Sequence, residues 1–285
     1  MIKRRNIWLL IIFGLVHTGL YSQSPEDKNA ALNESLRKVE FFLIKEDSQQ
    51  RHKVVNEFTS LISTFETLRS KEKDDHAFLQ KLFQKTHRKS LNRYNLYSDF
   101  GDTMLSGKYG CLSGTITYAL LLSHFNFDYE VIELANHVYL QVHLGTSIIL
   151  FESTLAARGF LDRPEDIKNA LERYSQRRTS DAMMAIAAAN DLPNSEIENS
   201  IGLSELAGLQ LYNRAIQTYK NSDLVSSLEF TLEAHEMYPS IRIKYLMQLL
   251  INEILYSKGL NEKVKQAALN NYIAHIRENR ISQSK

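Results

Sequence analysis

The sequence predicts an α+β protein in which a small antiparallel sheet lies between two helical regions. Apolar residues recur every three or four positions in residues 25–90 and again after residue 203, which is the periodicity of amphipathic helices. Between these regions, residues 137–144 alternate polar with apolar side chains and are followed by Gly145 and Thr146, a pattern typical of a strand that enters a tight turn.

The composition is that of a globular chain and excludes several classes of protein. Of 285 residues, 44% are hydrophobic and only one is Cys, which excludes low-complexity disorder and a disulfide-stapled scaffold. Lys and Arg number 34 and Asp and Glu 33, so the net charge of +1 gives no basic surface for a nucleic acid. We therefore expect no nucleic-acid partner.

Residues 1–22 have the pattern of a signal peptide. A basic start at residues 3–5 precedes an apolar stretch at residues 7–16, and residues 20–22 form an exit to cleavage before Gln23. The apolar stretch is shorter than the roughly 20 residues of a membrane span. We expect cleavage, an exported protein that is periplasmic or secreted, and no stable membrane span; the alternative is an uncleaved N-terminal anchor.

Residues 23–90 are predicted to form a helical region. Ser24 and Pro25 suit an N-cap and a first helical position, and the spacing of apolar residues predicts three amphipathic helices. The charged stretch at residues 69–75 is interpreted as a solvated turn between two of them.

Residues 91–162 hold the candidate chemistry, beginning with Cys111. Gly110 allows a sharp turn directly before a helical run that starts at Cys111 and places Leu112, Ile116 and Ala119 on one side. Free N–H groups in the first turn of a helix favour a thiolate over a thiol. An unpaired Cys in an exported protein is a reactive group, an intermolecular link or an inert apolar residue, and its surroundings decide which.

Two further candidates lie on a predicted hairpin. After a short strand at residues 129–134, His137 begins one strand and Glu152 ends the antiparallel return strand, nearly opposite His137. A thiolate, an imidazole and a carboxylate are the nucleophile, the base and the orienting acid of acyl transfer through a thioester. A metal site from His137, His143 and Glu152 is excluded because six strand residues separate the two His by about 20 Å. No cofactor or metal is expected.

Three sequence blocks resemble the signature of the transglutaminase-like superfamily. The blocks are Gly-Cys-Leu-Ser-Gly-Thr at residues 110–115, Asn-His-Val-Tyr-Leu-Gln-Val at 136–142 and Leu-Phe-Glu-Ser-Thr at 150–154. The resemblance implies a papain-like α+β core with Cys111 as nucleophile, His137 as general base and acid, and Glu152 as the group that orients His137. It also implies that the backbone N–H groups of Cys111 and Leu112 face the developing oxyanion.

The chain departs from that family pattern at two points. The family usually has Asp where this chain has Glu152, and the side-chain donor expected upstream of the nucleophile is not obvious. Asn92, Asn95 and Tyr97 are the candidates for that donor.

The remainder of the chain is predicted to be helical. Residues 163–202 are interpreted as a connector and linker, with a helix from Pro164 to about residue 174, an Ala- and Met-rich stretch at 182–189 and a linker at 190–202. Residues 203–285 form the last region, in which residues 211–239 resemble one tetratricopeptide repeat. Because one repeat cannot bury its own apolar face, helices at 240–257 and 261–279 are expected to stack on it, either as a structural brace or as an arm that binds a protein partner.

Two functions follow from this pattern. The leading hypothesis is an exported cysteine hydrolase, a peptidase or amidase that acts on a peptide or protein substrate through a Cys111 thioester. Hydrolysis is favoured over glutamine-to-lysine cross-linking, because bacterial exported members of the resembling family are mostly hydrolases. The alternative is a catalytically inactive scaffold that retains the fold and binds a partner through its helical tail.

Overall fold

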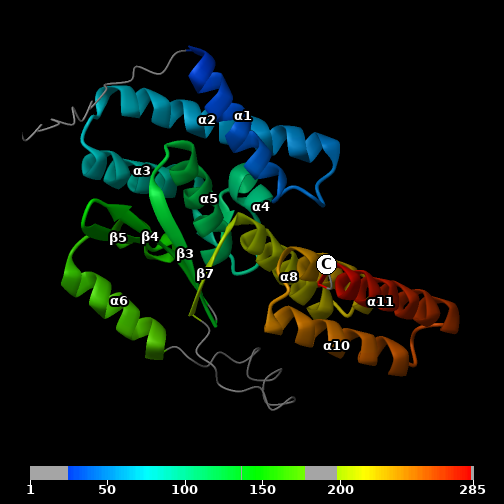
Figure 1. The fold of residues 1–285 in the computed structure, drawn as a ribbon. Coiled ribbons are helices and arrows are strands. Elements are labelled where there is room, and N and C mark those ends of the chain that lie inside the picture. Colours follow the sequence, from blue (N-terminus) through cyan, green and yellow to red (C-terminus); the bar gives the residue numbers. More distant parts are fainter. Residues whose placement is uncertain (1–24, 136, 177–197, 284–285) are drawn as a thin grey trace, which may run out of the picture.

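The computed structural model describes residues 25–135, 137–176 and 198–283. It is an α+β structure with N-terminal helices, a five-stranded antiparallel sheet and a C-terminal helical region (Figure 1). The predicted signal peptide and the stretch at 182–189 lie outside the described residues. None of the helices within those three ranges is long and apolar enough to cross a membrane.

The three predicted N-terminal helices are present as α1 (Pro25–Glu40), α2 (Ser48–Lys71) and α3 (Asp75–Ser90). Asp47 and Asp74 cap α2 and α3, because their carboxylates accept hydrogen bonds from first-turn N–H groups. The periodic apolar side chains of α2 and α3 are buried, as their spacing predicts: Val54, Phe58, Leu61, Ile62, Phe65, Phe78, Leu79, Leu82 and Phe83.

The segment before Cys111 contains three short elements that the sequence analysis does not predict. It contains β1 (Arg93–Tyr94), the short helix α4 (Phe100–Ser106) and β2 (Lys108–Tyr109), which pairs with β1 in parallel. Helix α5 (Cys111–His124) then begins at Cys111, and it is buried on nearly all sides rather than on one. It is the central helix of the molecule, because α1, α4, α8 and the sheet all pack on it.

The sheet has the strand order β6-β5-β4-β3-β7. The expected hairpin and its preceding strand are β3 (Asp128–Leu134), β4 (Val138–Leu144) and β5 (Ser147–Phe151). A 3-10 helix, η1 (Ser153–Arg158), leads to β6 (Phe160–Leu161), which pairs with β5. Strand β7 (Glu198–Ile201) lies in the stretch interpreted as a linker and instead forms the edge next to β3, where its backbone gains ladder partners.

The two faces of the sheet are covered by different helices. Alternate β4 residues Val138, Leu140 and Val142 join the main core with α5, whereas Tyr139 joins a smaller cluster with residues of α6 (Pro164–Gln176). Figure 1 shows α6 lying along the sheet on the side away from α1 and α2. Strand β4 thus packs against α5 on one face and α6 on the other.

The C-terminal region consists of α8 (Leu203–Lys220), α9 (Leu224–Met237), α10 (Ile241–Tyr256) and α11 (Glu262–Gln283). Helices α8 and α9 pack closely, since the buried Ser227 hydroxyl on α9 donates to the Ala215 carbonyl on α8 at 2.8 Å. Helices α10 and α11 stack on this pair as expected and share its hydrophobic cluster. The tetratricopeptide resemblance itself stays a prediction.

The regions named from the sequence share one interior. A single hydrophobic cluster takes side chains from α1, α2, α3, α5, the sheet and α8. Polar contacts tie the C-terminal helices to it: Gln210 accepts from Phe100 N and donates to Phe42 O, and Arg214 forms ion pairs with Glu46 and Asp99. The described parts of residues 25–90 and 91–162 therefore share one hydrophobic core with α8.

Candidate active site

Cys111 lies at the first position of α5, as its sequence context predicts. Gly110 is the N-cap residue, and a Cβ added there would lie 2.8 Å from the Leu96 carbonyl oxygen, so a larger residue would displace the chain before the thiol. The Ser113 hydroxyl accepts the Gly110 N–H at 3.0 Å and fixes the helix start. The Cys111 side chain is partly exposed, which a nucleophile requires.

His137 and Glu152 meet as the hairpin predicted. The Nε2 of His137 donates to Oε2 of Glu152 over 2.6 Å. In the β4–β5 ladder Leu140 pairs with Phe151, so extending the register places Glu152 opposite Tyr139 and leaves His137 two residues further along the same face. The contact is therefore diagonal, and the long Glu side chain has the reach that a diagonal pair demands.

The same imidazole lies near the thiol, because the Cys111 side chain is one of the groups that raise the pKa of His137. Since Nε2 is engaged by Glu152, the nitrogen left for Cys111 is Nδ1. The three residues that the sequence nominated thus come from the start of α5, the residue before β4 and the residue after β5.

The Glu152 carboxylate is almost completely buried and has four hydrogen bonds. Its Oε1 accepts from Thr154 N at 2.8 Å and from the Thr154 hydroxyl at 2.6 Å. Its Oε2 accepts from His137 and from the Tyr174 hydroxyl. Thr154, two positions after Glu152 in the third sequence block, thus satisfies the carboxylate oxygen that His137 does not use.

The electrostatics of the pair follow from these contacts. Burial alone lowers the pKa of His137, but Cys111 and Glu152 more than offset burial and raise the pKa to about 10. Burial alone raises the pKa of Glu152, but His137, Thr154 and Tyr174 more than offset it and lower the pKa to about 2. The imidazole is therefore cationic and the carboxylate anionic at neutral pH.

Tyr174 is a site residue that the sequence analysis missed. It lies near the end of α6, its hydroxyl donates to Glu152, and its ring packs on His137 with centroids 4.9 Å apart and on Tyr139 at 5.2 Å. Burial and the negative charge of Glu152 raise the pKa of Tyr174 well above 10, so it stays a donor. The sequence predicts the helix that carries Tyr174, but it does not indicate that this helix lies over the hairpin.

The candidate oxyanion site has backbone donors. The N–H groups of Cys111 and Leu112 lie in the first turn of α5, where they have no acceptor within the helix. Of the three side-chain candidates, Asn92 donates to Lys89 O at 3.5 Å, Asn95 Oδ1 accepts from Tyr97 N at 3.2 Å, and the Tyr97 hydroxyl accepts from Lys220. The contacts of Asn95 and Tyr97 use their acceptor atoms, so a side-chain donor from this set stays a prediction.

Close packing sets the distance between α5 and the segment that carries Glu152. A Cβ added at Gly114 would lie 2.7 Å from Ser153 Cβ. The Ser153 hydroxyl donates to the Cys111 carbonyl at 3.3 Å, and His87 on α3 contacts Ser153 O at 3.2 Å. Gly114 in the first block therefore allows the third block to approach Cys111.

A Ser–His–Glu array elsewhere in the molecule is structural. Ser35 Oγ lies 2.9 Å from His124 Nδ1, and His124 Nε2 lies 3.4 Å from Glu66 Oε1. Ser35 and His124 are buried, and the hydroxyl proton of Ser35 goes to the Ala31 carbonyl. The array therefore connects α1 and α5 without presenting a nucleophile, and burial lowers the pKa of His124.

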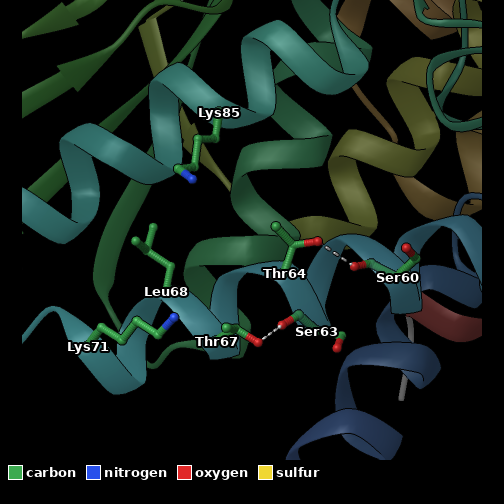
Figure 2. Close-up of a pocket in the computed structure, with 7 residues that line it drawn as sticks. All are labelled: Ser60, Ser63, Thr64, Thr67, Leu68, Lys71 and Lys85. Atoms are coloured by element: carbon green, nitrogen blue, oxygen red, sulfur yellow. Dashed lines mark hydrogen bonds between the residues drawn. The ribbon is translucent and has the colours of Figure 1, made fainter.

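Two other kinds of site find less support. Within the part of the chain that the structure describes, no three His, Cys, Asp or Glu residues are grouped as metal ligands. A polar groove lies between α2 and α3 (Figure 2), lined by Ser60, Ser63, Thr64, Thr67, Leu68, Lys71 and Lys85. Its two Thr hydroxyls donate to the carbonyls of Ser60 and Ser63 in their own helix, so they are not directed at a ligand.

Comparison with models of protein families, with curated proteins and with solved structures finds no match. The resemblance to the transglutaminase-like superfamily therefore rests on the three sequence blocks alone.

Proposed function

We propose that the protein is an exported cysteine hydrolase of transglutaminase-like type that cleaves an amide bond in a peptide or protein through a Cys111 thioester. The observation that carries this proposal is that the His137 imidazole hydrogen-bonds to the buried Glu152 carboxylate at 2.6 Å and lies near enough to Cys111, at the first position of α5, for the Cys111 side chain to raise its pKa. Nucleophile, base and orienting acid in this order constitute a catalytic triad.

In the first half of the reaction His137 holds the proton of the Cys111 thiol, and the thiolate sulfur attacks the amide carbonyl carbon. The carbonyl oxygen becomes an oxyanion beside the N–H groups of Cys111 and Leu112. When the intermediate collapses, the C–N bond breaks and the His137 imidazolium gives its proton to the leaving amine. The products are a thioester on Cys111 and a neutral imidazole.

In the second half the neutral His137 takes a proton from water, and the hydroxide formed attacks the thioester carbonyl. The C–S bond breaks, the acid leaves, and thiolate and imidazolium are regenerated. Glu152 keeps Nε2–H pointed away from the thiol and stabilises the cation in both halves. The family resemblance favours water over a lysine amine as acceptor, and hence hydrolysis over cross-linking.

The scaffold alternative is favoured by one feature of the site. The side chains of Asn92, Asn95 and Tyr97 hydrogen-bond to Lys89 O, Tyr97 N and Lys220, so the oxyanion donors that can be assigned are backbone N–H groups. Loss of one oxyanion donor costs enzymes a factor of about 10² to 10³ in rate. A scaffold would tolerate Cys111→Ser without loss of its cellular role, whereas the enzyme would not.

The test is the rate of Cys111 alkylation as a function of pH in the purified mature protein, followed by intact mass. We expect fast reaction well below the free-thiol pKa of about 8.5, and slowing at low pH in His137→Ala. His143→Ala is the matched control, because His143 lies at the far end of the same strand and should leave the profile unchanged. An unreactive thiol, or one that titrates near 8.5 regardless of His137, contradicts the proposal.

A further inference from the structure

The C-terminal helices hold a buried carboxylate beside the triad. Glu133 on β3 is 1% exposed, and its partners come from the α9–α10 corner: Arg242 Nη2 at 2.9 Å and the Tyr238 hydroxyl at 2.5 Å. The Arg242 side chain is itself 10% exposed. Glu133 pairs across the ladder with Val138, the residue next to His137.

A short chain of bonds joins this cluster to His137. Arg242 Nη2 donates to the Leu134 carbonyl at 3.1 Å, and the Leu134 N–H donates to the His137 carbonyl at 2.8 Å. Arg242 thus contacts both the Glu133 carboxylate and the Leu134 backbone, and the Leu134 N–H in turn hydrogen-bonds to the His137 carbonyl. The diagonal geometry of the His137–Glu152 contact makes it sensitive to where the His137 backbone lies.

Gly208 on α8 allows the α9–α10 corner to pack closely. A Cβ added at Gly208 would lie 2.6 Å from Tyr238 Cβ, so only Gly admits Tyr238 at that distance. A buried carboxylate deprived of its cation is strongly unfavourable and drives water entry or rearrangement. The Leu134 backbone, which hydrogen-bonds to the His137 carbonyl, would then move with Glu133.

We propose that Arg242 is a positioning residue, through which the C-terminal helices set the place of His137 against Cys111 and Glu152. This inference rests on the proposed function for its catalytic meaning, but the position of His137 is measurable without substrate. It assigns the helical tail a role in the active site rather than a partner-binding role alone.

Arg214 supplies the matched control. It is also a mostly buried Arg of the C-terminal helices and forms ion pairs with Glu46 and Asp99, but it contacts neither Leu134 nor Glu133. A residue that only braces the helices would behave like Arg214. A residue that positions His137 would in addition change the titration of the imidazole.

The experiment compares Arg242→Met, Arg242→Lys and Arg214→Met in the full mature chain. The first readout is the His137 imidazole titration by NMR, assigned with His137→Ala; the second is the pH profile of Cys111 alkylation. His137 is faced by Cys111, Glu152, Tyr139 and Tyr174, all unchanged in these variants.

We expect Arg242→Met to lower the His137 midpoint by at least about one pH unit and to slow alkylation about tenfold at acidic pH. Arg242→Lys should restore part of the shift, and Arg214→Met should reduce stability without moving either profile. If Arg242→Met does not fold, Tyr238→Phe removes one donor to Glu133 and should give a smaller shift in the same direction.

Unchanged profiles in folded Arg242→Met, or an equal shift in Arg214→Met, overturn the positioning role while leaving the proposed function intact. The opposite outcome is a raised His137 midpoint in the wild type that shifts in Arg242→Met, together with an unreactive Cys111. It would contradict the proposed hydrolase and support the positioning role of Arg242. A wild-type midpoint near 6.5 contradicts both.

Discussion

Replacement of Glu152 by Gln should change how the stability of the protein depends on pH. The substitution keeps the shape of the side chain but removes the charge that faces His137 at 2.6 Å. A lowered pKa in the folded state means that Glu152 contributes stability above its unfolded value of 4.5, which is lost as the pH falls toward 2. A raised pKa means that His137 contributes stability below its unfolded value of 6.5, which is lost as the pH rises toward 10.

The magnitude follows from the lowered pKa of Glu152. A fall from 4.5 to about 2, at 1.36 kcal/mol per unit, corresponds to about 3 kcal/mol in the free energy of unfolding. The pKa of His137 rises by more than the pKa of Glu152 falls, because Cys111 also raises it and the substitution leaves Cys111 in place. The expected loss of unfolding free energy in Glu152→Gln is therefore the value of about 3 kcal/mol from Glu152. This loss should be fully present between pH 4.5 and 6.5.

The assay is urea unfolding of wild type and Glu152→Gln from pH 3 to 10. The difference between the two proteins should be greatest at pH 4.5 to 6.5 and shrink toward both ends. Glu72→Gln is the control, since Glu72 lies far from the triad and contacts Lys81 at the surface. A difference that is constant with pH, or below about 1 kcal/mol at pH 5.5, would refute the argument that this pair is charged and buried.

Three further substitutions test the geometry of the site. Glu152→Asp introduces the residue usual in the resembling family but should lower activity, because the shorter side chain falls short of the diagonal contact with His137. The measurement is kcat on any substrate found, or the pH profile of Cys111 alkylation. Tyr174→Phe should cost about 1 kcal/mol and move the acid unfolding midpoint to higher pH, since Glu152 loses a donor; acid titration by circular dichroism would show it, and an unmoved midpoint would contradict it. Gly114→Ala should cost about 1–3 kcal/mol and slow Cys111 alkylation, because its methyl group would displace Ser153; thermal unfolding checks this, and an unchanged Tm would show that the segment yields freely.

Local patterns in the sequence predicted most of the secondary structure. Helical spacing located α1, α2 and α3, and alternation with the Gly145 turn located β4 and β5, because these signals depend on neighbours only a few residues apart. The stretch that contains β7 is interpreted from the sequence as a linker because it holds Pro193 and several Asn and Ser residues. Its pairing with β3 arises between segments about 65 residues apart in the chain.

The candidate triad was nominated by the same local signals. A Gly before Cys111 marks a helix start, and a hairpin register relates His137 to Glu152 within 15 residues. What those signals did not contain was the direction in which each side chain points. The diagonal reach of Glu152 to His137 and the hydrogen bond from Tyr174 to Glu152 required the packed structure.

The sequence by itself thus determined the candidate catalytic residues Cys111, His137 and Glu152 and the helix and hairpin next to them, since both follow from residue type and short spacing. Only the tertiary structure shows that the Tyr174 hydroxyl donates to Glu152 and that Arg242 donates to the Leu134 carbonyl. These contacts join residues 22 and 108 positions apart in the chain. Such contacts are selected by the burial of charge and apolar surface over the whole molecule, and no local pattern encodes them.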